Sequence, residues 1–412
     1  MKTTSHLPQL LGARSSFSPI RNLSPESLTR HLDAFHAGNL RPAALLWDAI
    51  ERRDDVLQAV ASKRKKGVAR LQWDILTTDG SPEALAQQTA LRFFYNTLSC
   101  VNAVDGNERG GFSLLVRQMM DAVGKKYAVH EIVYRVHRQS RIGEGLQPLI
   151  SAEFRFVPLE FFENGTGRLR FLAREEDREG MVLEEGSWLT TVGDGLMEAC
   201  SIAYLFKHLP LRDWLIYCER NGMPGIKGIT DAFPGTSQWE VAKRAVESFG
   251  AEFHALMTAG SDLQAIDLGA KGELPYPGLV ERMDRAMAAL WCGSDLSTLS
   301  RASAVGASLQ SGERASLEAE DAAMISETLN AQVDRYVLGH LFGDGPARAY
   351  LRLRPIAQED VLRDLEIYER LSRLGISIPA GDLRERFGIG LPEKERPVDA
   401  PKNSPLSPAG PE

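Results

Sequence analysis

A run of four cationic side chains, Lys63-Arg64-Lys65-Lys66, is the part of the sequence best equipped to bind an anion. Lysine and arginine bind phosphate groups through charge and N–H donors, so the run could contact nucleic acid. Cations are also favoured at the C-terminal end of a helix, where they face the negative end of the helix dipole. The run therefore favours an exposed helix end or an intersubunit salt-bridge site, and a phosphate-binding patch stays open as the alternative.

Motifs for catalysis and metal binding are incomplete. Gly124-Lys125-Lys126 lacks both the earlier glycine and the hydroxyl of a phosphate-binding loop. His130-Glu131 does not extend to an HExxH zinc motif, because position 134 is tyrosine. Ser308 lies outside any GxSxG elbow, so no catalytic residue, metal ligand or cofactor site is predicted.

A serine-rich segment over residues 293–312 is predicted to be a long polar loop, with glycines at its start, within it and at its end. Loops of this length are uncommon in packed domains unless they are functional or disordered. The segment is therefore a place to look for activity, and a hydrolase that uses it as a lid or nucleophile site remains one hypothesis.

The composition is that of a globular protein of two to four packed units, with 412 residues, 43% hydrophobic and 25% charged. The formal net charge of −7 disfavours a protein that coats DNA by neutralising it, so any DNA contact is expected to be local or weak. The four cysteines form no CxxC pair, which indicates neither zinc nor disulfides and favours a reducing compartment. No export signal or membrane segment is predicted.

The elements that must position these residues alternate between helices and strands, which predicts an α+β fold. A first helix begins at the cap Ser24-Pro25-Glu26, and another follows Ser81-Pro82-Glu83. Further helices are predicted over residues 42–68, 112–123, 196–220 (bent at Pro210), 238–257, 276–292, 313–354, 358–374 and 380–387. Strands are predicted over residues 71–76, 125–136, 153–157, 169–172, 188–192, 225–229 and 263–268.

Several stretches carry a resemblance to one known family. They are Arg53-Asp54-Asp55, Leu71-Gln72-Trp73-Asp74-Ile75, Tyr127-Ala128-Val129-His130-Glu131-Ile132, Cys218-Glu219-Arg220-Asn221-Gly222-Met223-Pro224 and the helix 318–330. In this order the stretches resemble the portal proteins of Mu-like tailed bacteriophages and prophages. The resemblance covers roughly residues 40 to 345.

The resemblance implies a subunit of a homo-oligomeric ring, typically dodecameric, at one capsid vertex through which DNA is packaged and ejected. Such a subunit is a conduit and not an enzyme. The implied regions are a flexible arm (1–25), an α/β wing (26–195), a stem (196–292) enclosing a small α/β clip (222–274), a tunnel-type loop (293–312), a long helix returning to the wing (313–354), a crown-like helical end (355–391) and a disordered tail (392–412).

The resemblance also implies partners and sites. Expected partners are further copies of the chain, double-stranded DNA bound without sequence preference, the terminase large subunit, the major capsid or scaffold protein and a head-tail connector. The protein is expected in the virion, and in the host cytoplasm during assembly, with no cofactor and no membrane. The side chains expected to touch DNA in the channel are Arg301, Ser303, Gln310 and Arg314. A DNA-binding regulator that acts through Lys63 to Arg70 is the remaining alternative.

Overall fold

The computed structural model describes residues 20–142, 145–173, 179–222, 226–247, 254–258, 275–293, 304–343, 345–354 and 360–374. The chain divides into two units, Met1–Pro355 and Ile356–Glu412. In the second unit the described element is α13 (Asp360–Arg373), which confirms the helix predicted over residues 358–374. The helix predicted at 380–387 and the tail at 392–412 lie outside the described residues.

The first three helices follow local signals in the sequence. α1 (Pro25–His36) begins after Ser24, whose hydroxyl accepts a hydrogen bond from Ser27 N, so the predicted start is confirmed. The single helix predicted over residues 42–68 is wrong, because it consists of α2 (Arg41–Arg53) and α3 (Asp55–Ala69). Asp54 separates them: its backbone is extended, and its Oδ1 accepts a hydrogen bond of 2.8 Å from Leu57 N, which caps α3.

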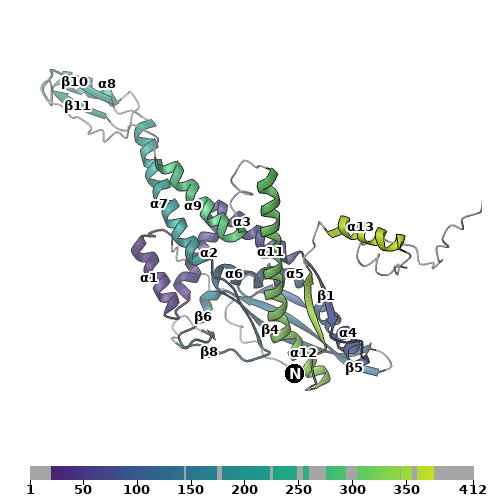
Figure 1. Ribbon diagram of the computed structural model, residues 1–412. Helices are drawn as coiled ribbons and strands as arrows, with labels where there is room; N and C mark the ends of the chain where they lie inside the picture. Colours follow the sequence, from purple (N-terminus) through teal and green to yellow (C-terminus); the bar gives the residue numbers. More distant parts are fainter. Residues whose placement is uncertain are drawn as a thin grey trace, which may run out of the picture. The chain divides into compact units, whose positions relative to one another are not determined.

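A five-stranded sheet in the order β3-β2-β5-β4-β9 forms the largest layer of the first unit (Figure 1). Its strands are β2 (Ser99–Asn102), β3 (Arg109–Gly110), β4 (Tyr127–Ile142), β5 (Gly145–Val157) and β9 (Trp188–Val192). β4 pairs antiparallel with both β5 and β9, and β2 pairs parallel with β5. α4 (Pro82–Thr97) packs on β5, while α5 (Phe112–Met119) and α6 (Asp121–Lys125) pack on β4. The strands predicted over 125–136, 153–157 and 188–192 are confirmed, and the helix predicted over 112–123 is interrupted at Met120.

Two smaller sheets also belong to the first unit. β1 (Gln72–Thr77) pairs antiparallel with β12 (Ala349–Arg354), so the helix predicted to run to residue 354 is wrong over these residues. Burial alternates along β12 because Ala349, Leu351 and Leu353 face the core, and a period of two is that of a strand. The other sheet contains β6 (Phe162–Glu163), β7 (Arg170–Phe171) and β8 (Met181–Val182), and follows the short helix η1 (Leu159–Phe161).

A helix pair is separated in the chain by a small α/β module. α7 (Met197–Gly222) continues as one helix through Pro210, and α9 (Pro275–Cys292) confirms the helix predicted over 276–292. The module contains β10 (Ile226–Thr230), α8 (Ser237–Glu247) and β11 (His254–Thr258), with the two strands parallel. The helix predicted to reach residue 257 is therefore wrong over residues 254–257, which belong to β11. The strand predicted at 263–268 lies outside the described residues.

The last long helix of the first unit begins earlier than predicted. α11 (Ala304–Leu329) starts inside the segment predicted to be a loop over 293–312, so that prediction is wrong for residues 304–312. Serine and glycine suggested a loop, but the intervening Ala304, Ala307 and Leu309 favour helix and outweigh them. After α11 the helix passes through a π-helical turn, η2 (Asn330–Asp334), and continues as α12 (Arg335–Phe342).

One hydrophobic core joins the helices to the main sheet. Its fully buried large side chains include Trp47 of α2, Phe94 and Tyr95 of α4, Phe154 of β5 and Trp291 of α9. A second cluster forms around Phe162, Phe171 and Trp188. Within the described residues, no helix is both long enough and apolar enough to cross a membrane.

Candidate functional site

α7 and α9 lie side by side and run antiparallel (Figure 1). Near their middle, Lys207 Nζ lies 2.6 Å from Asp284 Oδ1, and farther along, the rings of Trp214 and Tyr276 stack with centroids 6.5 Å apart. Residue numbers thus rise along α7 as they fall along α9. The two helices therefore pack against each other as an antiparallel pair, and α9 also packs against α3.

Lys207 attaches this helix pair to α3. Its side chain is 9% exposed, and its Nζ lies 2.9 Å from Asp54 Oδ2 and 3.1 Å from Asp55 Oδ1, in addition to Asp284. Burial alone lowers the pKa of an ammonium, but hydrogen bonds to these carboxylates raise the pKa of Lys207 well above its ordinary value. Burial raises the pKa of Asp284, and the neighbouring Asp54 and Asp55 raise it further. A single ammonium, that of Lys207, therefore pairs with three carboxylates where α7 and α9 meet the start of α3.

The basic run predicted as a phosphate or intersubunit patch is divided between the interior and the surface. Arg64 Nε donates to Asp321 Oδ2 at 2.7 Å and Arg64 Nη2 donates to Asp321 Oδ1 at 2.9 Å, which binds α3 to α11. Lys65 is buried and pairs with Glu51 and Asp121. Lys63 and Lys66 are exposed, so the four residues do not form one continuous surface patch.

The predicted channel contacts fall in and before α11. Arg301 and Ser303 lie outside the described residues, and Gln310 lies on α11. Arg314 is exposed on α11. Burial raises the pKa of the Cys292 thiol, while the nearby charges of Lys63, Arg64 and Arg314 act to lower it. The fold thus brings Arg314 and Lys63, which were predicted separately, to the same end of α9.

α7 presents apolar side chains to solvent. Phe206 is 53% exposed and Leu215 is 61% exposed. Ile202, Ile216 and Tyr217 are also exposed. Ile202 and Phe206 are about one helical turn apart, and Tyr217 follows Phe206 by about three turns, so these three share a face. The hydropathy pattern of α7 did not reveal this surface, because apolar residues occur around the whole helix.

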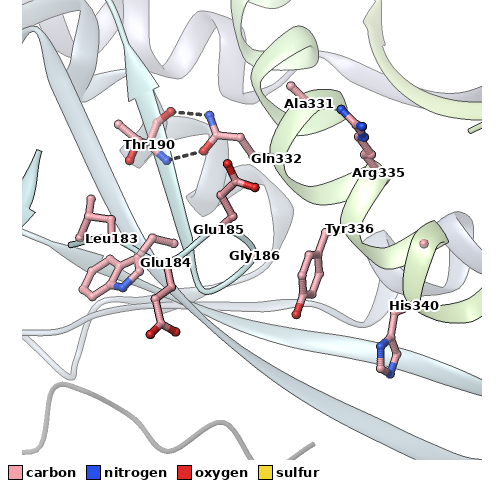
Figure 2. Close-up of a pocket in the computed structure, with 12 residues that line it drawn as sticks. Leu183, Glu184, Glu185, Gly186, Thr190, Ala331, Gln332, Arg335, Tyr336 and His340 are labelled. Carbon is pink, nitrogen blue, oxygen red and sulfur yellow. Dashed lines mark hydrogen bonds between the residues drawn. The ribbon is translucent and has the colours of Figure 1, made fainter. Parts of the chain in front are cut away.

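A pocket of about 750 Å³ lies between the turn after β8 and the η2–α12 segment (Figure 2). Gln332 closes one side: its Oε1 accepts from Thr190 N at 2.9 Å and its Nε2 donates to Thr190 O at 2.8 Å. Glu184 and Glu185 lie on the strand side, and Arg335 and His340 lie on the helix side. Sequence reasoning missed this pocket, because its two walls are some 150 positions apart in the chain.

Across the described residues, no cluster of three or more His, Cys, Asp and Glu side chains is arranged to hold a metal ion. Ser308 lies within α11, which is not the strand-to-helix turn that a GxSxG nucleophile requires. The described residues therefore offer a helix pair, an apolar surface and scattered cations, and not a catalytic constellation.

The chain is similar to chains in solved structures of gene transfer agent particles. A chain in the virion of the native gene transfer agent (GTA) particle is 10% identical, with a TM-score of 0.47, and the match covers 88% of this chain and 99% of that one. A chain in the neck of the native GTA particle with C12 symmetry is 12% identical, with a TM-score of 0.47 and coverages of 89% and 99%. A chain in the neck of the empty GTA particle with C6 symmetry is 11% identical, with a TM-score of 0.45 and coverages of 83% and 93%.

No curated protein matches the sequence. A family model does match it, that of the portal protein of Mu bacteriophage, over residues 44–389. Since this match spans most of the 412 residues, the chain belongs to the Mu bacteriophage portal protein family.

Proposed function

We propose that this phage portal subunit, a component of the ring at a capsid vertex, conducts double-stranded DNA through that ring during packaging and ejection. We assign α7 and α9 to the stem of the ring and the β10–α8–β11 module to the clip, where a terminase motor docks. The major capsid or scaffold protein and a head-tail connector are the other partners. The subunit works without catalysis or cofactor, in the virion and, during assembly, in the host cytoplasm.

The observation that carries this proposal is the apolar surface of α7. Ile202, Phe206 and Tyr217 are exposed on one face of a helix that leaves the core, and such an apolar surface is typically covered on association. Because the ring is built from identical subunits, each copy offers this surface to its neighbour. The surface is then buried only in the assembled ring.

Charge on this surface is expected to prevent assembly. Ile202→Glu combined with Phe206→Glu places carboxylates in a contact that must lose its water, and a buried unpaired charge is costly. We expect the ring fraction to fall at least about tenfold, which corresponds to about 1.4 kcal/mol. Solution mass and negative-stain images measure it, with Leu85→Glu as the control, because Leu85 is 50% exposed on α4. Rings formed in unchanged yield by the double variant would contradict the assignment.

The DNA contacts are proposed at the segment before α11 and at its first turns. Over residues 313–320 the exposed charged side chains are Glu313, Arg314 and Glu320, which give this part of the helix a net charge of −1. A channel that passes DNA in both directions must hold phosphates loosely, and carboxylates prevent tight binding while a few cations touch the backbone. Arg314, and Arg301 with Ser303 and Gln310, are the proposed contacts.

Replacing Arg301 and Arg314 by alanine is expected to reduce packaged DNA several-fold while rings still assemble. Each arginine supplies one phosphate contact per subunit. Every subunit of the ring loses the same contacts in the variant, so a small loss of binding free energy per subunit adds up over the ring. DNA per particle and ring mass are measured together. Arg212→Ala serves as the control, because Arg212 is 64% exposed on α7. Loss of the ring itself would assign the two arginines a structural role.

The two alternative functions fit the described residues less well. A hydrolase that uses Ser308 requires a strained turn, whereas residue 308 lies within a helix. A DNA-binding regulator requires a continuous basic face, whereas Arg64 and Lys65 are engaged with carboxylates inside the chain.

A further inference from the structure

A second pocket, of about 380 Å³, collects positive charge between α2–α3 and α5–α6. The cationic residues that line it outnumber the carboxylates. The cations are Arg52, Lys65, Lys66, Arg117 and Lys125, and the carboxylates are Glu51, Glu108 and Asp121. Asp48, which pairs with Lys125, reduces the excess to one positive charge. The pocket is thus net cationic on a chain whose formal net charge is −7.

Two buried lysines, Lys65 and Lys125, line this pocket. Lys65 Nζ donates to Glu51 Oε1 at 2.5 Å and to Asp121 Oδ1 at 2.8 Å. Lys125 Nζ donates to Asp121 Oδ2 at 2.8 Å and also to Asp48. Burial opposes their charge, but these carboxylates raise the pKa of both lysines above the ordinary value, so both are charged at neutral pH. Each ammonium carries three N–H donors, and these carboxylates engage two of each. The Lys65 ammonium also lies 5.8 Å from the centroid of the Trp291 ring.

Gln118 also lines this pocket. It is 6% exposed, and its Oε1 accepts from Cys100 Sγ at 2.9 Å and lies 3.3 Å from His130 Nε2. Its Nε2 is buried and has no hydrogen-bond partner among the described residues. A buried donor without a partner costs about 1–3 kcal/mol, so this amide is set for an acceptor that the described residues do not supply.

One acceptor at the same pocket is also open. Glu51 Oε1 binds Lys65, while Glu51 Oε2 is buried and has no hydrogen-bond partner within the described part of the chain. A ligand that matches the pocket must therefore accept several hydrogen bonds and donate one. Monohydrogen phosphate has this combination, whereas sulfate and a phosphodiester carry no proton to donate.

We propose that this pocket binds inorganic phosphate, an oxyanion that accepts hydrogen bonds from Lys65, Lys125 and Gln118 and donates one to Glu51. Lys66 is exposed on the rim and supplies further positive charge. The site is independent of the proposed DNA conduit, because a phosphodiester lacks the proton that Glu51 would accept. Either proposal can fail without the other.

The test is isothermal titration calorimetry of the full chain with phosphate and with sulfate at constant ionic strength, at a pH where monohydrogen phosphate is the main species. Binding is measured directly, because both anions also stabilise folded proteins by exclusion from the surface. We expect saturable phosphate binding and at least about tenfold weaker sulfate binding. That ratio corresponds to about 1.4 kcal/mol.

A matched pair of variants lies on the same helix. Lys66→Glu is expected to weaken phosphate binding at least about tenfold, because Lys66 lines the pocket. Lys63→Glu makes the same charge change at an exposed position of α3 that does not line the pocket, and wild-type affinity is expected. Equal losses in the two variants, equal affinity for the two anions, or no saturable binding would each overturn the site.

Discussion

Lys207→Met is expected to lower the free energy of unfolding by about 3–5 kcal/mol, the usual cost of removing one partner from a buried ion pair. Methionine fills a similar volume but leaves Asp54, Asp55 and Asp284 without their ammonium. The Asp54 side chain is 2% exposed and the Asp284 side chain 15%, so water replaces little of the lost interaction. Urea unfolding followed by tryptophan fluorescence measures the change.

The position of Lys207 makes a second readout informative. Asp54 caps α3 and Asp284 belongs to α9, so loss of the ammonium should loosen α7 and α9 before the main sheet. Hydrogen exchange is expected to rise in residues 197–222 and 275–292. Lys243→Met is the matched control, because Lys243 is half exposed and its carboxylate partner is 4.0 Å away. Its expected change is within about 0.5 kcal/mol. A Lys207→Met protein as stable as this control would refute the anchoring role.

Three carboxylates surround the single ammonium of Lys207, so removing one of them gives a further test of the charge interaction. In the Lys207→Met background, Asp284→Asn removes a carboxylate that has lost its cation, and we expect it to recover part of the stability. The two substitutions are in direct contact, so their effects should not add. Simple additivity would show that Lys207 stabilises the protein through packing and not through charge.

Sequence patterns predicted the elements whose causes are local. Ser24 and Ser81 cap α1 and α4 in the structure, because a cap depends on residues within one turn. The apolar spacing of 276–292 likewise predicted α9. The strand β12 was missed, since its stability comes from pairing with β1 nearly 280 positions earlier, as in Asp74 opposite Arg352.

The candidate sites were less predictable for the same reason. The charge run at residues 63–66 was visible, but its partners are Asp321 on α11 and Asp121 on α6. No local rule connects positions so far apart. A cationic run therefore indicates the presence of charge, and only the fold decides whether that charge faces solvent or a carboxylate.

Asp334 is expected to give stability a pH dependence that an isosteric variant removes. It is 1% exposed in the π-helical turn, where Tyr95 Oη donates to its Oδ1 at 2.5 Å and Leu351 N donates to its Oδ2 at 2.8 Å. Burial raises the pKa of Asp334 to about 7, although these two hydrogen bonds act to lower it. The folded protein therefore holds this proton at pH values where the unfolded chain, with an aspartate pKa of about 3.9, has released it.

The direction follows from that difference. The stabilisation is complete below about pH 4 and is lost as the pH rises through the folded pKa, at about 1.4 kcal/mol per pH unit between about 4 and 7. His130 opposes this, because burial lowers its pKa to about 3 and its contribution is lost as the pH falls below about 6.5. The two slopes cancel over much of this range, so the wild-type curve alone does not reveal either group.

The informative quantity is the free energy of unfolding of the wild type minus that of Asp334→Asn, measured by urea titration from pH 4.5 to 7.5. Asparagine does not titrate. Its hydrogen bond with Leu351 N is weaker than that of aspartate, which shifts the free energy of unfolding by about 1–3 kcal/mol at every pH without changing the slope. The difference is expected to fall by about 1.4 kcal/mol per pH unit up to about pH 7, because the His130 contribution is common to both proteins and cancels. Asp213→Asn, at a position 55% exposed on α7, should give a flat difference. A flat difference for Asp334→Asn as well would mean that Asp334 is ionised in the folded protein, held by its two donors despite its burial.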